Sequence, residues 1–545
     1  MAYYKDMREF LKALDKAGKL RTVSKTINKD TEMHPLVRWQ FLGLPEHERT
    51  GFLFENVSGL KKKKYNCRVA TAVMAASREI YAMGMKTTPD KIHEAWRRAY
   101  AHPIPPTLVS TGPVKDEVHV GDNLLQHGGM DEFAVPFSTN GWEGLPRLTA
   151  VSWHTKDPDT GIINIGTYNG TVLERDHISC RANSANTHLH LHWDKCKQRG
   201  IPLQAAAVLG AVPAISYVSV SKVPYGIPEQ SVAGGIAQEP IEMVKCETMD
   251  MMVPATAEIV LEGEISTDYV EPDAASGEHL GYTIVGGYVY AFKIKAITHR
   301  KNPIWHDYVS QMPPSESSTL RGIGGEGRWL TFLRDHVGIP QVKDVAFHHC
   351  AGAWRILVIR MQDIGGKRTQ NHVVQQALLA SLSVQAGFPK IAIAVDEDIN
   401  PWDLESVFWA VSFRFQPHRD AKIIQGRISG LDQSISPYGE DMEEEGQEED
   451  SFPLSRTGPQ GASAMMIDAT RKWPYTPVAL PKKQYMEKAR KIWEELGFPR
   501  LKETEPWYGI SLGVWPERYQ KQAEWAEKGQ FEKVAADLMK GAKKV

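Results

Sequence analysis

The sequence contains few cysteines, no excess of charge of either sign and no long apolar run. It has 64 lysines and arginines against 66 acidic residues, a net charge of −2, so no overall field draws it to nucleic acid or to an anionic membrane. Its five cysteines form no Cys-x-x-Cys pair, and one is left over from any pairing, which argues against a disulfide scaffold and favours a reducing compartment. We therefore expect a cytoplasmic protein with no nucleic-acid or membrane partner.

Signals for secretion and membrane insertion are also missing. The first eleven residues carry charges where a secretory signal needs an apolar run of roughly 7–15 residues. The longest weakly charged stretch, 201–220, is interrupted by Gly210 and Pro213 and is rich in alanine and β-branched residues. This composition predicts buried strands rather than a membrane span of about 20 residues.

What the sequence does contain is enough apolar material for several domains. Its 545 residues are 42% hydrophobic and predict roughly two to four folded domains. Apolar positions repeat at helical spacing over 4–17 and stop at Gly18, whereas residues 145–310 are rich in strand-like alternation. Beyond residue 320, helical patterns alternate with short apolar runs. We expect a mixed α+β and α/β fold divided into regions 1–112, 113–320 and 321–545.

The segment most informative about chemistry runs from Val244 to Gly263 and leads into an acidic, glycine-flanked loop. That loop carries the carboxylates of Glu271, Asp273 and Glu278. Carboxylates on such a loop act as general acids or merely solvate a turn, and composition alone leaves both roles open.

Three histidines alternate along the chain at His188, His190 and His192. On a strand all three would share one face, whereas on a helix only His188 and His192 would. The cluster suggests a metal, but no His-Glu-x-x-His motif is present, so structural roles for His190 and His192 stay open. The glycine-rich segment 322–327 follows no apolar strand, which argues against a nicotinamide dehydrogenase.

Several motifs taken together resemble the UbiD family of prenylated-flavin-dependent decarboxylases. They occur in the family's order over most of the chain, at 4–11, 164–168, 244–263, 277–282, 395–403 and 467–472. The resemblance implies a central split β-barrel that binds the flavin, flanked by α/β regions, of which the last helps to form a homo-oligomer, either a dimer or a hexamer.

The resemblance also implies the reaction, which is reversible non-oxidative decarboxylation of an aromatic or α,β-unsaturated acid. Prenylated FMN would serve as the electron sink, and a flavin prenyltransferase would supply it. A divalent metal, Mn²⁺ first with Fe²⁺ or Mg²⁺ as alternatives, and K⁺ would bridge the protein to the flavin phosphate.

Position by position, the resemblance assigns the divalent metal to Asn164, His188 and Glu229. His188 keeps the family's separation from Asn164, and Asn186 or His192 would replace it under a small shift. The flavin site implied by the same matching consists of Asn164, Ile165, Thr167, Asn169, Thr187, His188 and Glu229.

The implied catalytic residues are Glu278, Asp273 or Glu271, and Asn169. Glu278 matches the acid that protonates the product carbon, and we expect burial to raise its pKa. Asp273 stands at the family's spacing for a second carboxylate, and Glu271 would serve only if two residues are inserted. Asn169 stands where the family has an arginine, so we expect an incomplete catalytic constellation.

That departure leaves two questions open. The substrate is a free aromatic acid or its CoA thioester, as in the phthaloyl-CoA decarboxylases of the family. The alternative function is that of a non-catalytic structural subunit in a multi-subunit carboxylase.

Overall fold

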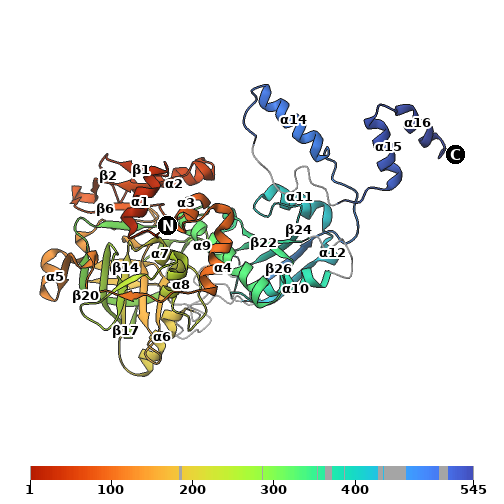
Figure 1. Ribbon diagram of the computed structural model, residues 1–545. Coiled ribbons are helices and arrows are strands. Elements are labelled where there is room, and N and C mark those ends of the chain that lie inside the picture. Colours follow the sequence, from red (N-terminus) through yellow and green to blue (C-terminus); the bar gives the residue numbers. More distant parts are fainter. Residues whose placement is uncertain are drawn as a thin grey trace.

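The computed structural model describes residues 2–182, 187–284, 287–352, 354–362, 371–385, 387–427, 432, 434, 462–501 and 513–543. Figure 1 shows two bodies side by side and an arm of helices that projects from the second. The N-terminal region and a large antiparallel sheet form the first body, and an α/β domain forms the second. The expected mixed α/β fold is confirmed.

Helix α1 (Met7–Lys16) follows the predicted pattern. Asp6 caps it by accepting a hydrogen bond from the Glu9 backbone N–H at 2.7 Å, and its apolar positions are buried. The chain leaves the helix at Gly18, whose φ of +70° is the left-handed conformation that glycine adopts without strain. Helix α4 (Ile92–Ala101) lies in the same N-terminal region.

The N-terminal sheet has four strands, one of which comes from far along the chain. Strand β21 pairs in parallel with β6, so this sheet joins the N-terminal region to the end of the central sheet. Its order is β1 (Leu20–Val23), β3 (Gly51–Phe54), β6 (Arg68–Thr71) and β21 (Ile304–Asp307).

The central sheet is antiparallel and curls into a half-barrel. Its longest strands, β17 (Ile259–Pro272) and β20 (Tyr288–His299), pair at its centre, and two register shifts between them bend the sheet. The order is β11 (Ile163–Thr167), β10 (Ser152–Lys156), β14 (Leu203–Leu209), β17, β20, β13 (His177–Cys180), β12 (Gly170–Glu174) and β9 (Arg147–Leu148), and β8 (Glu117–Val120) also pairs with β20.

The expectation of buried strands throughout 201–220 was wrong in its second half. β14 is a buried strand, but residues 213–220 form helix α7 (Pro213–Val220). Pro213 occupies the first turn, where its missing N–H breaks no intrahelical bond. Every residue of α7 is buried, so the segment lacks the polar face whose period would have indicated a helix.

The C-terminal domain is built on a five-stranded sheet with the order β22 (Val342–Phe347), β23 (Ile356–Met361), β24 (Ile391–Asp396), β26 (Ala462–Ala469) and β25 (Ala421–Arg427). The three inner strands run parallel, and α10 (Asn371–Ser381) and α11 (Leu404–Arg414) lie beside them. The glycines of 322–327 are inside helix α9 (Glu316–Thr331), so they form no dinucleotide-binding loop.

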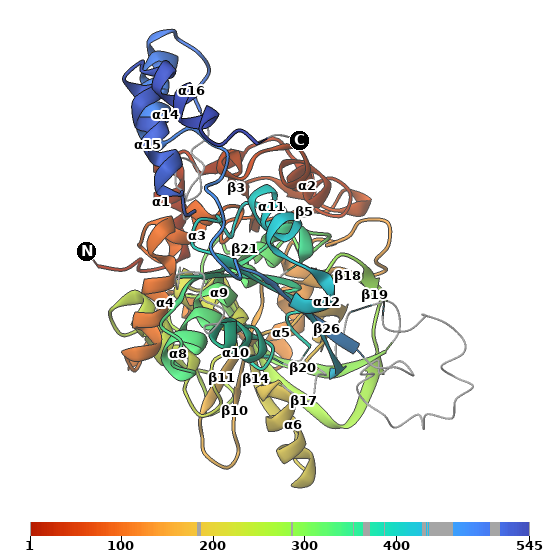
Figure 2. The same cartoon turned by 90° about the vertical axis from the view of Figure 1, so that its right-hand side faces the viewer.

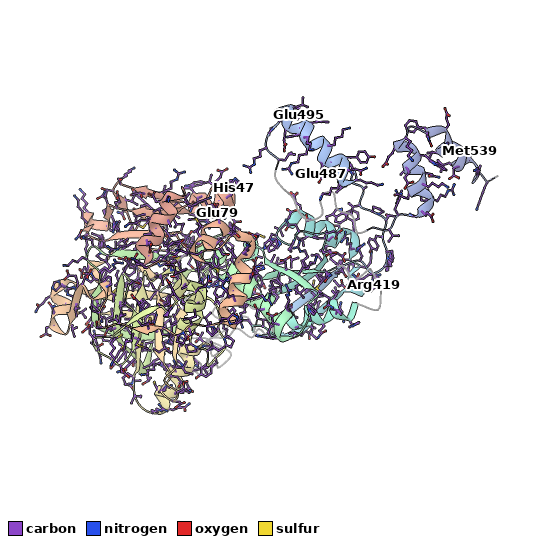
Figure 3. All side chains as sticks on the ribbon, in the orientation of Figure 1. His47, Glu79, Arg419, Glu487, Glu495 and Met539 are labelled. Atoms are coloured by element: carbon purple, nitrogen blue, oxygen red, sulfur yellow. The ribbon has the colours of Figure 1, made fainter. Side chains whose placement is uncertain are left out.

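The last helices extend away from both bodies in two perpendicular views (Figures 1 and 2). They are α14 (Lys483–Glu495), α15 (Glu517–Glu527) and α16 (Phe531–Met539). Figure 3 shows Glu487 and Glu495 on α14 and Met539 on α16 pointing into open space. None of the helices in the described ranges combines the length and apolar character that a membrane crossing requires.

A single buried carboxylate on α9 joins the two bodies. Glu326 Oε2 accepts from Arg78 and lies 3.1 Å from His93 Nε2, both in the N-terminal region. Its Oε1 accepts from the backbone N–H of Phe347 at 3.1 Å and from Trp402 Nε1 at 3.0 Å, both in the C-terminal domain. Burial raises the pKa of Glu326, but Arg78 and His93 outweigh it and lower the pKa to about 2.

We expect Glu326→Ala to lower the free energy of unfolding by about 3–5 kcal/mol, because it leaves buried donors from both bodies unpaired. Urea denaturation measures the loss. The exposed Glu487, which forms an i,i+4 pair with Lys483, is the control, and Glu487→Ala should cost less than about 0.5 kcal/mol. Because the pKa of Glu326 falls from 4.5 to about 2, its stabilisation is present above pH 4.5 and is lost as the pH falls towards 2. Equal stability of both variants would contradict this role.

Candidate functional site

Two polar clusters lie at the two ends of β11. The first surrounds Asn164 near the start of the strand, and the second surrounds Asn169 just beyond its end. The residues assigned to a metal lie in the first cluster, and Glu278 and Asp273 lie in the second.

In the first cluster, Asn164, His188 and Glu229 line one small cavity of about 10 Å³, roughly the room that one water or one ion occupies. They come from three elements. Asn164 is on β11, His188 begins α6 (His188–Gln198), and Glu229 begins α8 (Glu229–Ala237) directly after Pro228. The tertiary structure therefore brings together three residues that are up to 65 positions apart in the sequence.

The donor atoms of this cavity fit a divalent cation. Glu229 Oε2 accepts from the Ile165 backbone N–H at 3.1 Å, which orients the carboxylate, while its Oε1 lies 3.6 Å from His188 Nδ1, beyond hydrogen-bond distance. Asn164 is buried, and its side-chain nitrogen has no hydrogen-bond partner among the described residues. A carboxylate oxygen, an imidazole nitrogen and an amide, which binds metals through its oxygen, are a ligand set for a metal such as Mn²⁺.

Two further residues line the cavity and were not predicted from the sequence, Asp157 and Tyr225. Asp157 accepts from Lys195 at 2.8 Å and from the Tyr225 hydroxyl, and these hydrogen bonds overcome burial and hold its pKa well below the usual range. Asp157 and Tyr225 belong to no motif, and only their contacts reveal them. The charge of Asp157 is therefore largely offset by that of Lys195.

The alternating histidines separate as the helical alternative predicts. His188 and His192 line the cavity together, whereas His190 turns away and its Nδ1 lies 2.5 Å from the Tyr290 hydroxyl. His192 Nδ1 lies 3.0 Å from Thr155 Oγ1, and burial lowers its pKa to about 4. Asn186, the other alternative for the ligand position, lies outside the described residues.

Two of the expected flavin-binding residues have local structural partners. Thr187 caps α6, since its hydroxyl accepts from the His190 backbone N–H at 3.2 Å and donates to the Ala182 carbonyl at 2.9 Å. The Thr167 hydroxyl lies 2.7 Å from that of Ser219 on α7. Their assignment to the cofactor stays a prediction.

The second cluster contains the expected acids together with two arginines. The Asn169 side-chain amide donates to Glu278 Oε1 at 3.3 Å, and His279 Nδ1 lies 3.0 Å from Glu278 Oε2. Asp273 forms an ion pair with Arg181 and lies 3.9 Å from Arg147 Nη1. Position 169 itself carries no charge, as the sequence shows, and the Arg181 and Arg147 guanidinium groups enter the cluster from other positions of the chain.

Arg181 reaches the cluster through the hairpin of β12 and β13. The Arg181 backbone N–H donates to the Asn169 carbonyl at 2.8 Å, so the residue twelve positions later lies directly beside Asn169. The guanidinium of Arg181 therefore brings a positive charge close to position 169, where Asn169 has none.

The expected rise in the pKa of Glu278 was wrong. Burial does raise it, but the hydrogen bond and charge of His279 and the charges of Arg181 and Arg147 outweigh burial and lower the pKa to about 2. Glu278 is therefore ionised at neutral pH in the unliganded protein.

Arg147 has unused donors. The side chain is 1% exposed, and its Nη1 donates to Thr171 Oγ1 at 3.3 Å. Its Nε and Nη2 are buried and have no hydrogen-bond partner among the described residues. Buried guanidinium donors without a partner are costly, and they have the geometry to pair with a carboxylate.

Glu271 is engaged elsewhere. Its Oε2 lies 2.9 Å from Nε2 of His177, which belongs to the neighbouring strand β13. Asp273 rather than Glu271 is therefore the second acid that shares arginine partners with Glu278.

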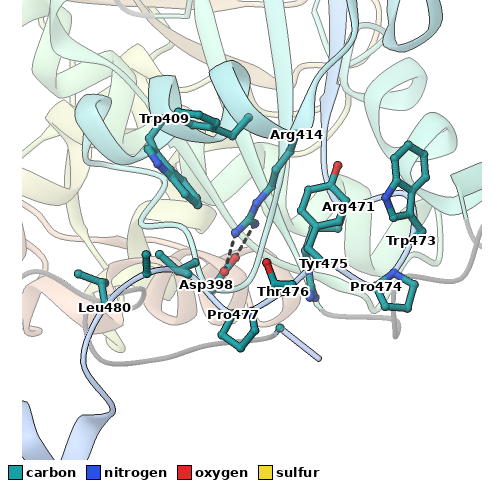
Figure 4. A pocket seen from close by; sticks show the side chains of 14 residues that line it. Asp398, Trp409, Arg414, Arg471, Trp473, Pro474, Tyr475, Thr476, Pro477 and Leu480 are labelled. Atoms are coloured by element: carbon teal, nitrogen blue, oxygen red, sulfur yellow. Dashed lines mark hydrogen bonds and ion pairs between the residues drawn. The ribbon is translucent and has the colours of Figure 1, made fainter. Parts of the chain in front are cut away.

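A larger cavity, of about 750 Å³, lies in the C-terminal domain (Figure 4). Its aromatic walls include Trp409 and Tyr475, and its charged groups are paired, since Arg414 donates to both oxygens of Asp398 at 2.7 Å. None of the predicted site residues lines it. Size alone therefore does not identify the site, and the two clusters at β11 are the candidates.

Comparisons with known proteins identify the family of the chain. A model of the 3-octaprenyl-4-hydroxybenzoate carboxy-lyase (UbiD) Rift-related domain matches residues 108–313, and a model of the C-terminal domain of the same family matches residues 319–469. An uncharacterised protein of Archaeoglobus fulgidus is 32% identical over 58% of this chain, and the match spans 61% of that protein.

Two further relatives have informative names. The phenolic acid decarboxylase of Bacillus subtilis is 29% identical over 80% of this chain and 90% of its own length. The structure of the UbiD-class enzyme HmfF from Pelotomaculum thermopropionicum, an evolved dimeric form in complex with prFMN, is 27% identical with a TM-score of 0.71, covering 88% of this chain and 97% of that one.

Proposed function

The chain belongs to the UbiD carboxy-lyase family of decarboxylases, and from this membership we propose that it catalyses the reversible, non-oxidative decarboxylation of an aromatic or α,β-unsaturated acid with prenylated FMN. The observation that carries the proposal is the cluster of Glu278, Asp273, Asn169, Arg181 and Arg147 at one end of β11, together with the cavity of Asn164, His188 and Glu229 at the other end. It combines an acid, an anion site and a metal site.

The unused donors of Arg147 bind the carboxylate of the substrate. A guanidinium presents two parallel N–H groups to a carboxylate, and burial strengthens the attraction. The motive for expecting a CoA thioester was a missing arginine charge, and Arg181 and Arg147 supply that charge. We therefore favour a free aromatic acid over an aryl-CoA substrate, in keeping with the name of the Bacillus relative.

Asn164, His188 and Glu229 would hold a divalent metal, Mn²⁺ before Fe²⁺ or Mg²⁺, which together with K⁺ would help to retain the flavin. Prenylated FMN, when bound, would supply the electron sink that loss of CO₂ requires. Ile165, Thr167, Asn169 and Thr187 are the further residues assigned to flavin binding, and a flavin prenyltransferase supplies the cofactor.

Glu278 and His279 move the proton. The C–CO₂ bond breaks, and a C–H bond forms at the same carbon with a proton from Glu278. A substrate carboxylate on Arg147 neutralises one of the charges that lower the pKa of Glu278 and adds a negative charge, so substrate binding raises that pKa. The proton comes from solvent, and His279, whose Nδ1 lies 3.0 Å from the carboxylate, relays it to Glu278. In the carboxylation direction, the ionised Glu278 accepts it.

A non-catalytic structural subunit fits this cluster less well, because burying unpaired Arg147 donors costs stability that a purely structural protein has no reason to lose. The extended C-terminal arm favours a homo-oligomer. Its helices α14 and α16 have no buried residue, and Phe531 and Met539 are 67% and 71% exposed. A second copy of the chain would cover them.

Glu278→Gln should lower decarboxylation by at least about 100-fold, because an amide cannot deliver the proton. The flavin should remain bound, since Glu278 is not among the residues assigned to its anchoring. Product formation from a panel of aromatic acids, with mass spectrometry of the released flavin, measures both. Glu271→Gln, which changes an acid outside the arginine cluster, is the control and should stay within about tenfold of the wild type. Undiminished turnover of Glu278→Gln would remove this residue from its role.

Arg181→Gln should lower decarboxylation by about 10–100-fold, the value of one hydrogen bond to a charged group. Adding Asn169→Arg to this variant should restore part of the activity. An arginine at position 169 returns a guanidinium to the cluster of Glu278 and Asp273. Asn169→Arg alone serves as the matched control and should bring no gain. If the double variant is no more active than Arg181→Gln, Arg181 does not stand in for a cation at position 169.

Glu229→Ala should reduce metal and flavin retention together, with metal affinity weakened at least about tenfold. Metal analysis and flavin absorbance of the purified variant measure the two occupancies. Glu242→Ala, at an exposed position on β15 (Glu242–Lys245), is the control and should keep both. Full occupancy in Glu229→Ala would place the metal elsewhere.

A further inference from the structure

A second cluster of metal-ligating side chains lies on the opposite margin of the central sheet. His119 is on β8, Glu132 ends the short turn Gly129–Glu132, and His299 is the last residue of β20. In the sheet order, β10, β14, β17 and β20 separate β11 from β8. Figure 1 shows the neighbouring helix α5 (Asp122–His127) at the edge of the first body farthest from the C-terminal domain.

The sheet register places the two histidines on one face. His119 pairs with Ile297, two residues before His299, so the two side chains are diagonal neighbours on adjacent strands. Both histidines are 4% exposed. Their burial and register hold the imidazoles in position before any ligand arrives.

The separations match the coordination shell of a small divalent metal. His119 Nε2 lies 3.2 Å from His299 Nε2, and His299 Nε2 lies 3.4 Å from Glu132 Oε1. The three ligand atoms all lie within 4.8 Å of one another. Two atoms bound to Zn²⁺ at 2.0–2.1 Å in tetrahedral geometry are about 3.3 Å apart.

Contacts around the cluster orient one ligand for metal binding. His299 Nδ1 lies 2.9 Å from the Arg300 carbonyl oxygen, which only accepts hydrogen bonds, so Nδ1 carries the proton. In the neutral ring, Nε2 then presents its lone pair to His119 and Glu132. This arrangement, an imidazole held through its other nitrogen by a carbonyl, is the usual support of a metal-ligating histidine. Phe133 packs edge-on against the same ring, with centroids 5.6 Å apart.

We propose that His119, Glu132 and His299 form a second metal site, which binds Zn²⁺ and is separate from the cavity at β11. Two imidazoles and one carboxylate suit Zn²⁺, and the 30% exposed side chain of Glu132 leaves the fourth position open to water. The ion ties the turn that follows α5 to β8 and β20, and so holds the segment 121–132 against the sheet.

The competing explanation is a metal-free contact in which a proton bridges the two imidazoles and Glu132 pairs with a protonated His299. The two explanations differ in their response to added metal. A proton-bridged cluster neither takes up a metal ion nor gains stability from one, whereas a metal site does both.

The test uses the full chain, stripped of metal by a chelator and titrated with Co²⁺, whose visible absorption reports tetrahedral binding, and then with Zn²⁺. We expect the wild type to bind one equivalent of metal more than His119→Gln or Glu132→Gln does. If a variant still binds that equivalent, the wild type should bind it at least about tenfold more tightly. His47→Gln, at a 78% exposed histidine labelled in Figure 3, is the matched control and should behave as the wild type.

Glu132→Gln decides the outcome if His119→Gln fails to fold, because the Glu132 side chain is partly exposed. Unchanged Co²⁺ uptake and spectrum in both variants would overturn the proposal. Uptake that disappears in Glu229→Ala but persists in Glu132→Gln would place the ion in the cavity at β11 and would overturn it as well.

Discussion

The buried carboxylate of Glu326 is the interaction on which the relation between the two bodies depends. It satisfies donors from the N-terminal region and from the C-terminal domain at the same time, so neither body can shift without leaving a buried donor unpaired. The same helix carries Arg321, whose charge interacts with Glu278. The joint between the bodies therefore also sets part of the electrostatic environment of the proposed proton donor.

Compensation of buried charge explains the composition of the second cluster. Glu278 and Asp273 lie in a region from which water is largely excluded, and the two carboxylates need positive partners there. Arg181 and Arg147 provide these positive charges. Two nitrogens of Arg147 have no hydrogen-bond partner among the described residues. Under the proposed function, the unpaired Arg147 donors would receive the substrate carboxylate, and its negative charge would raise the pKa of the neighbouring Glu278.

Much of the fold and part of the site could be predicted from local sequence. Helix α1 has an apolar face, and its periodicity indicated it. The helical alternative for the histidines correctly paired His188 with His192, because helix geometry alone decides which positions share a face. Helix α7 was mistaken for strands, since a segment buried on all sides carries no period.

The sequence by itself determined the family motifs and the strand-rich middle of the chain, because both rest on short-range pattern, and the resemblance to the family then supplied the candidate ligands Asn164, His188 and Glu229. The tertiary structure alone decided that Arg181 stands beside Asn169 and that the pKa of Glu278 falls to about 2 rather than rising. The physical reason is that a pKa and an ion pair depend on distances in space, and a hairpin brings together charges that no local pattern connects.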